Sequence, residues 1–295
     1  MSRISDYPSQ FDALFRSAAV DGWLHALDLA DGREIEYRAD EPVVAASVFK
    51  IPVLVELCRQ ADAGQIDLTE ANTLPVPGRA PGPTGLSMGL DAATLSWRDQ
   101  ALSMIVVSDN ATTDSLIGRL GLERINATMR AMGLPGTQLE GDCRQLFAQM
   151  TEDAGYSSRS EFPAKPDMEL LRRLRALQAP RTNRTTPRET SRLLAAIWRD
   201  EAASPEGCAL MRRILGAQVW PHRLASGFPE DDVRTAGKTG TLVTVRNEAG
   251  VVSYPDGRHY AVSVFTCSHA VRTKHPAQDR AIGQAARLAV DLLRG

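Results

Sequence analysis

The chain has 295 residues, of which 43% are hydrophobic, and it carries a formal net charge of -2 with an isoelectric point near 6.2. This length and apolar content are enough to bury a full core, so neither a disordered nor a fibrous protein is indicated. The nearly balanced charge provides no basic surface for nucleic acid or for an anionic membrane, which favours small-molecule partners.

The N-terminal part of the chain predicts a helix, a hairpin and a second helix. Residues 8–19 show the apolar spacing of an amphipathic helix. Two alternating runs, residues 23–29 and 33–38, flank an Asp-Gly turn at residues 31–32, which is typical of a β-hairpin. An apolar stretch over residues 47–63 then predicts a buried helix.

Helical patterns dominate the middle of the chain. A Pro- and Gly-rich loop over residues 75–89 precedes them. The predicted helices of this block cover residues 97–107, 111–120, 122–132, 168–177 and 187–202. The polar residues 133–166 interrupt them and predict a long irregular loop, which in compact proteins is more often functional than inert.

Strand patterns return after residue 209. The predicted strands and the helix that follows them cover residues 242–252, 259–267 and 277–293. Strands from both ends of the chain around a helical block predict an α+β fold, in which one sheet carries an inserted all-helical lobe. We expect residues 1–43 and 214–295 to form the α/β lobe and residues 44–213 the helical lobe.

Several absences narrow the chemistry. The four cysteines form no CxxC pair and the five histidines no metal pattern, so we expect core thiols, no metal and no cofactor.

The first twenty residues contain Asp6, Pro8 and Asp12, where a secretory signal needs an uninterrupted apolar run. No apolar run is long enough for a membrane span. We therefore expect a cytoplasmic protein without a membrane partner, although a secreted protein trimmed of its leader would look the same.

The first motif that carries chemistry is Ser47-Val48-Phe49-Lys50, at the head of the apolar helix. Only four of the 34 basic residues are lysines, and a buried lysine can lose its proton as arginine cannot. Three residues of helix place Ser47 and Lys50 one turn apart, where the amine can take the hydroxyl proton. The alternative is a helix cap followed by a solvated lysine. Apolar neighbours oppose it, because a lysine buried among them needs a partner.

The second motif, Ser108-Asp109-Asn110, joins two predicted helices. Ser, Asp and Asn are preferred N-cap residues, so an ordinary helix cap is one interpretation. In the functional alternative, Ser108 passes a proton to a leaving nitrogen and Asn110 holds a substrate amide.

The third motif, residues 238–241 with the sequence KTGT, is predicted at the start of a strand. Its glycine allows close backbone approach to a ligand, while the lysine and the hydroxyls can bind a carboxylate. An ordinary strand entry is the bland alternative. A phosphate loop is excluded because position 232 is Asp, where that loop requires glycine.

In this order the SxxK, SDN and KTG motifs resemble the signature of the penicilloyl-recognising serine enzymes, and the pattern is most similar to the class A β-lactamases. The likeness extends over nearly the whole chain, through the segments SVFKIPVLVEL, MIVVSDNATTD, TTP, HRL and NEAGVV. It implies a five-stranded antiparallel sheet flanked by helices, an all-α lobe, and an active site between them.

Carried over by position, the resemblance gives each motif residue a role. Ser47 is the expected nucleophile, Lys50 its general base and Ser108 the proton relay. The expected substrate-binding residues are Asn110, Lys238, Thr239, Gly240 and Thr241. Asn110 would bind the acyl side chain, Lys238 and Thr239 the substrate carboxylate, and the N–H groups of Ser47 and Thr241 the oxyanion.

Two features of class A enzymes have no counterpart in the sequence. The Glu-x-x-Leu-Asn segment, whose glutamate activates the deacylating water, is absent. Glu169 is the nearest acid but belongs to a plain amphipathic pattern, and Glu161 lies in the long loop. The usual carboxylate-binding arginine is missing from its expected places, which leaves Arg246 and Arg258 as candidate substitutes.

We expect acyl transfer from an amide, lactam or ester through a covalent Ser47 acyl-enzyme, with β-lactam hydrolysis as the first named activity. The missing leader and glutamate favour an alternative, a cytoplasmic esterase, amidase or transacylase that deacylates β-lactams slowly. A non-catalytic binder using the same cleft is the third hypothesis. In each case the partner is a small molecule with a carboxylate, and neither nucleic acid nor a membrane.

Overall fold

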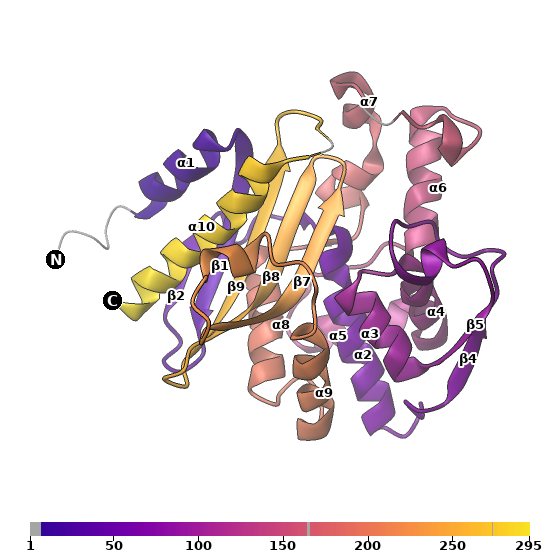
Figure 1. Ribbon diagram of the computed structural model, residues 1–295, viewed down its shortest axis with the longest axis horizontal. Helices are drawn as coiled ribbons and strands as arrows, with labels where there is room; N and C mark the ends of the chain where they lie inside the picture. Colours follow the sequence, from indigo (N-terminus) through magenta and orange to yellow (C-terminus); the bar gives the residue numbers. More distant parts are fainter. Residues whose placement is uncertain (1–6, 164–165, 273) are drawn as a thin grey trace.

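The computed structural model describes residues 7–163, 166–272 and 274–295, and it places one antiparallel sheet between layers of helices (Figure 1). The strands of this sheet are β1 (Val20–Asp28), β2 (Glu34–Tyr37), β7 (Arg234–Leu242), β8 (Val245–Ser253) and β9 (His259–Ser268). Their order is β2-β1-β9-β8-β7, and every neighbouring pair is antiparallel. The predicted α+β class with a five-stranded antiparallel sheet is confirmed.

Two smaller sheets and a set of helices complete the fold. The short strands pair as β3 (Val43–Val44) with β6 (Arg184–Thr185) and β4 (Ala71–Leu74) with β5 (Ala93–Ser96). The helices are α1 (Tyr7–Ser17), α2 (Lys50–Asp62), α3 (Trp97–Val106), α4 (Asn110–Leu120), α5 (Leu122–Ala131), α6 (Cys143–Ala154), α7 (Met168–Arg173), α8 (Pro187–Trp198), α9 (Pro205–Leu215) and α10 (Pro276–Arg294).

The central strand β9 shows why both faces of the sheet are covered. Successive side chains of a strand point to opposite faces, and those of β9 are apolar on both. Val262 and Val264 pack in the core beneath α1 and α10, whereas Ala261 and Phe265 belong to the core shared with α2 and α8. Because that second core runs on into the helical block, the two layers are packed together. The proposed division into lobes stays a prediction.

The segment predicted as an irregular loop, residues 133–166, contains helix α6, so that prediction is wrong. Asp142 accepts a hydrogen bond from the backbone N–H of Gln145, and Gln145 returns one, which makes a complete capping box. Leu146, Phe147 and Met150 give the helix an apolar side that packs inward. The mostly polar composition of the segment hid this helix. Helix α9 was likewise not predicted.

Candidate active site

The predicted nucleophile stands on a short helical turn beside the sheet. Ser47 belongs to the 3₁₀ turn Ala46–Phe49, which leads directly into α2. Ala46 has a φ of +44°. This left-handed conformation costs a residue with a Cβ about 1–3 kcal/mol, and such strain gathers at functional sites. The turn presents Ser47 to a pocket at the head of a buried helix.

Strand β7 approaches this turn closely because Gly240 has no side chain. A Cβ at Gly240 would lie 2.9 Å from the carbonyl oxygen of Ala45 and 3.2 Å from the backbone nitrogen of Ser47. These separations are too short for ordinary packing, so the approach requires glycine. On β8, Asn247 Nδ2 donates to the carbonyl oxygens of Val44 at 2.9 Å and Ala45 at 3.3 Å. The backbone of the third motif is therefore held against the backbone of Ser47.

Lys50 is fully buried and joins the first motif to the second. Its Nζ lies 2.8 Å from the carbonyl oxygen of Ser108, 3.2 Å from Ser108 Oγ and 2.8 Å from Asn110 Oδ1. Burial lowers the pKa of the Lys50 ammonium. Within the described residues, the Ser47 hydroxyl makes no hydrogen bond to the protein, so it is open to a ligand. The arrangement suits an amine that takes a proton once a substrate is bound.

The second motif divides its residues between the fold and the pocket. Asp109 caps α4 by accepting a hydrogen bond from the backbone N–H of Ala111 at 3.0 Å. Ser108, at a φ of +61°, and Asn110 both line the pocket and contact Lys50. Asp109 therefore makes the helix cap, whereas Ser108 and Asn110 lie at the pocket, where their roles stay predictions.

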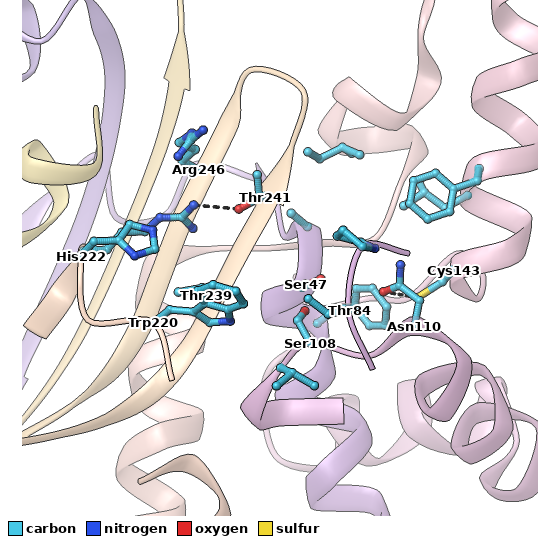
Figure 2. A pocket seen from close by; sticks show the side chains of 18 residues that line it. Ser47, Thr84, Ser108, Asn110, Cys143, Trp220, His222, Thr239, Thr241 and Arg246 are labelled. Atoms are coloured by element: carbon cyan, nitrogen blue, oxygen red, sulfur yellow. Dashed lines mark hydrogen bonds between the residues drawn. The ribbon is translucent and has the colours of Figure 1, made fainter. Parts of the chain in front are cut away.

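A pocket of about 410 Å³ opens where these elements meet (Figure 2). Ser47 and Ser108 lie at its centre, with Thr239 of β7 on one side and Asn110 and Cys143 on the other. Thr241 lines the pocket as well, whereas Lys238 and Gly240 do not. Residues that are far apart in the sequence therefore converge on Ser47.

Lys238 lies behind the pocket wall and does not line the pocket. It is fully buried, and its Nζ donates to the carbonyl oxygen of Thr239 at 2.8 Å. Burial lowers its pKa well below the ordinary value, and the charge of Lys50 lowers it further. The sequence predicted the KTGT motif at the start of a strand, and this is wrong. Strand β7 begins at Arg234, so the motif lies in the middle of the strand. Because successive side chains of a strand point to opposite faces, Lys238 is turned away from the pocket that its neighbour Thr239 lines.

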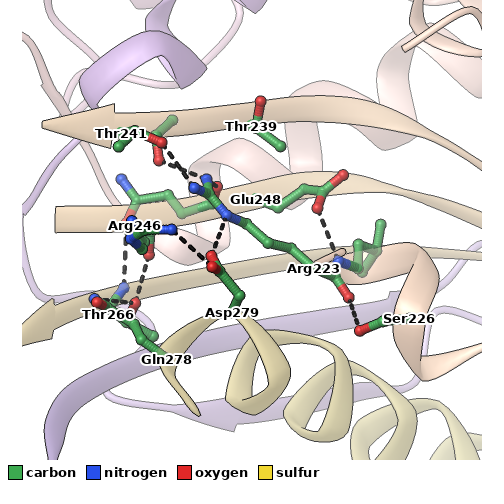
Figure 3. A network of polar contacts seen from close by, with 12 residues as sticks. Arg223, Ser226, Thr239, Thr241, Arg246, Glu248, Thr266, Gln278 and Asp279 are labelled. Carbon is green, nitrogen blue, oxygen red and sulfur yellow. Dashed lines mark hydrogen bonds and ion pairs between the residues drawn. The ribbon is translucent and has the colours of Figure 1, made fainter. Parts of the chain in front are cut away.

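Two arginines, Arg223 and Arg246, line the pocket, and Arg246 is one of the two substitutes that the sequence offered for the usual carboxylate-binding arginine. Arg223 donates from Nη2 to Thr241 Oγ1 at 2.8 Å and from Nη1 to the carbonyl oxygen of Gly240 at 2.9 Å. Asp279 of α10 accepts from Arg223 Nε at 2.8 Å and from Arg246 Nη1 at 2.7 Å (Figure 3). One carboxylate thus orients both guanidinium groups. The HRL segment was the signal in the sequence for Arg223.

Other charged residues that the sequence suggested lie elsewhere. Arg258 pairs with Asp28 and does not line the pocket. Glu169 is exposed on α7, and Glu161 accepts a hydrogen bond from the backbone N–H of Ser157. In the ranges that the structure describes, no group of three or more His, Cys, Asp or Glu could hold a metal ion. None of the helices in the described ranges is long and apolar enough to cross a membrane.

Helix α6 forms the pocket wall next to Asn110. Its residues Cys143, Leu146 and Phe147 share one face by helical spacing and line the pocket. The Cys143 Sγ lies 3.5 Å from Asn110 Oδ1, and burial raises the pKa of the thiol, so it stays protonated. Among the described residues, neither Asp nor Glu lines the pocket. A water bound beside the nucleophile would find no carboxylate in this wall.

Comparison with known proteins agrees with this geometry. The matching family model is that of the β-lactamase enzyme family and covers residues 7–293. Similar proteins include the β-lactamase regulatory protein BlaB of Streptomyces cacaoi, 28% identical over 96% of both chains. A β-lactamase of Streptomyces albus G is 26% identical, over 98% of this chain and 85% of that protein.

Solved structures show the same fold. A β-lactamase from Sphaerobacter thermophilus has a TM-score of 0.76 at 26% identity over 96% of both chains. An acyl-enzyme complex of a PBP-A mutant with penicillin G has a TM-score of 0.78 at 22% identity over 97% of both chains. The fold is that of the class A β-lactamases, and the resemblance seen in the three motifs is confirmed. With a family model matching nearly its whole length, the chain belongs to the β-lactamase enzyme family.

Proposed function

We propose that this protein is a serine acyl-transfer enzyme that β-lactams acylate at Ser47 and that releases the acyl group slowly. One observation carries the proposal. Lys50 is buried at the head of the pocket that Ser47 lines, with its pKa lowered and its Nζ hydrogen-bonded to Ser108 and Asn110. A lysine whose pKa is lowered in this way loses its proton more readily and can act as a proton acceptor.

Acylation follows from these contacts. The neutral amine of Lys50 accepts the proton of Ser47 while Oγ attacks the lactam carbonyl carbon. The backbone N–H groups of Ser47 and Thr241 stabilise the oxyanion, which the close approach at Gly240 favours. When the C–N bond breaks, the proton moves from Lys50 through the Ser108 hydroxyl, 3.2 Å away, to the leaving nitrogen. The product of this step is an ester on Ser47.

The polarity of the pocket indicates the acyl donor. The guanidinium group of Arg223, which donates to Thr241 Oγ1, suits a carboxylate. Thr239 and Thr241 lie on the same side of the pocket (Figure 2). The apolar lining residues are Ala46, Phe49, Pro83, Val107, Leu146, Phe147, Trp220 and Leu242. They suit an uncharged, largely apolar acyl group. A β-lactam with one carboxylate and an apolar side chain fits both requirements.

Deacylation requires a water that is held and deprotonated beside the ester. General-base assistance of this kind supplies about 10²–10⁴-fold in rate. The described residues that line the pocket include no carboxylate, and the wall beside Asn110 presents Cys143, Leu146 and Phe147. We therefore expect acylation to outpace hydrolysis of the ester. An amine or alcohol acceptor would relieve this block if the natural reaction is transacylation.

A second candidate function is a β-lactam-responsive regulator, and the same wall favours it. A long-lived acyl-enzyme reports that the ligand has been encountered, whereas rapid turnover would erase the signal. The similar protein from Streptomyces cacaoi is named a β-lactamase regulatory protein. The two candidates share the acylation step and differ in the fate of the ester.

Intact-protein mass spectrometry after mixing with benzylpenicillin tests the proposal. We expect one equivalent of adduct on Ser47 within the mixing time, persisting for minutes. Ser47→Ala should abolish it, and Ser17→Ala, at an exposed serine outside the pocket, should not change it. Labelling that persists in Ser47→Ala would refute the nucleophile. Steady turnover without a burst would refute slow release.

A further inference from the structure

We propose that Glu248 and Gln218 are positioning residues that hold pocket segment 219–223 against the sheet and so determine how well the site takes the carboxylate of its acyl donor. The inference rests on the proposed function, because it concerns the same pocket. Neither residue lines that pocket. Both act through the segment between them.

Glu248 ties the two ends of this segment together. It lies on β8 and is 2% exposed. Its Oε1 accepts a hydrogen bond from Gln218 Nε2 at 2.7 Å. Its Oε2 accepts one from the backbone N–H of Leu224 at 2.7 Å, which is the contact drawn from Glu248 in Figure 3. Gln218 and Leu224 are the residues directly before and after segment 219–223. A single buried carboxylate therefore closes the base of this loop.

Gln218 also connects the loop to the strand that carries the third motif. Its Oε1 accepts a hydrogen bond from the backbone N–H of Thr239 at 2.7 Å. Because β7 is the edge strand of the sheet, this N–H would otherwise lack a partner strand. Thr239 is also the register partner of Glu248 on β8. The loop, β7 and β8 are thus joined by one amide and one carboxylate.

The segment held in this way supplies three of the residues that line the pocket, one of them a guanidinium. Trp220, His222 and Arg223 all line the pocket. Between its ends the segment is exposed or half-buried from Val219 to His222, and the backbone N–H of Val219 reaches the carbonyl oxygen of Val106 only at 3.4 Å. Releasing the ends would free several residues, and fixing them again when the ligand binds would cost conformational entropy. Preorganised binding depends on that cost being met before the ligand arrives.

The charges around Glu248 make this clamp sensitive to pH. Burial raises the pKa of Glu248 to about 7, while the Leu224 N–H, the Arg223 guanidinium, the Gln218 amide and the Lys238 ammonium lower it. Above this pKa the carboxylate can accept both hydrogen bonds. Below it the carboxyl group carries its own proton, which needs an acceptor, so one of the two contacts weakens. The clamp should loosen as the pH falls.

Two variants and two probes test the proposal. Gln218→Met keeps the length of the side chain but removes both amide contacts, and Glu248→Gln replaces one acceptor with a donor. Benzylpenicillin carries the carboxylate, and p-nitrophenyl acetate does not. We expect either variant to lower the second-order rate constant for acylation by benzylpenicillin about tenfold, as for one lost hydrogen bond, and to leave that for the acetate within about twofold. Hydrogen exchange in segment 219–223 should quicken.

The controls separate the possible failures. Gln149→Met, at a half-buried glutamine outside the pocket, should change neither rate. Equal losses with both probes, or none with either, would overturn the positioning role. If Glu248→Gln does not fold, the partly exposed Gln218 decides the question. If the wild type binds benzylpenicillin but is never acylated, the proposed function fails. In that case calorimetry measures benzylpenicillin binding to Ser47→Ala with and without Gln218→Met or Glu248→Gln. A dissociation constant that neither substitution changes would overturn the positioning role.

Discussion

Lys50→Arg is the substitution that tests the chemistry of the site most directly. Arginine retains the positive charge but stays protonated at any working pH, so it cannot take the proton of Ser47. If Lys50 acts only by its charge, arginine should replace it. If the neutral amine is the base, acylation should collapse. The lowered pKa of the buried lysine favours the second outcome.

The magnitude follows from two effects. Loss of general-base catalysis costs about 10²–10⁴-fold in the acylation rate, which corresponds to about 3–5 kcal/mol in activation free energy. The larger guanidinium also has to enter a fully buried site whose acceptors, Ser108 and Asn110, lie within 3.2 Å of Lys50 Nζ. Overpacking of this kind costs about 1–3 kcal/mol in folding free energy. The expected rise in activation free energy is larger than the expected cost of strain to folding. Loss of acylation in a folded Lys50→Arg variant therefore reports the loss of the base.

Stopped-flow acylation with benzylpenicillin from pH 5 to 10 measures the effect, with circular-dichroism melting as the check on folding. Wild-type acylation should rise with pH through the lowered pKa of Lys50 and then level off, because the deprotonated amine is the active form. The variant should be slow and should lose the rise that depends on Lys50, keeping only the smaller change that titration of Glu248 near pH 7 produces. Lys274→Arg, at an exposed lysine, is the matched control and should behave as the wild type. A folded Lys50→Arg variant with a loss below tenfold would refute the assignment of the base.

Three further predictions concern the pocket wall, the buried acid and the ligand. Leu146→Glu should place a carboxylate on the pocket face of α6 and hasten loss of the Ser47 adduct by about 10²-fold or more; the uncharged Leu146→Gln is its control, and equal adduct lifetimes in the two would contradict this. The pKa of Glu248 is raised from 4.5 to about 7, so the free energy of unfolding that its protonated form contributes is present below pH 4.5 and is lost as the pH rises to 7. Chemical denaturation should therefore show that the wild type loses about 3 kcal/mol of unfolding free energy over this range relative to Glu248→Gln. A difference between the two proteins that does not change with pH would refute the shift. Ampicillin, whose acyl group carries an ammonium, should acylate about tenfold more slowly than benzylpenicillin, because the described lining residues offer that ammonium no carboxylate; equal rate constants would show that an acid reaches the pocket.

The amino-acid sequence by itself determined the features that depend on local spacing. Ser47 and Lys50 are three residues apart, and both lie in the helical stretch that runs from the turn Ala46–Phe49 into α2. The Asp-Gly turn between two alternating runs sufficed for the hairpin of β1 and β2. The apolar pattern of residues 259–267 likewise identified a strand, because a strand buried on both faces is apolar throughout. These signals act between neighbours in the chain and need no tertiary contact.

Only the tertiary structure decided what each buried charge contacts. Lys50 finds its acceptors 58 and 60 residues away, on Ser108 and Asn110. Arg223 finds Asp279 at a separation of 56 residues. No periodicity links such positions, since a buried ion is satisfied by whichever segment the packing brings beside it. The same holds for the wall of α6, which faces Asn110 only because the helix docks against α4. That the described lining residues of the pocket include no carboxylate is therefore a property of the packed molecule.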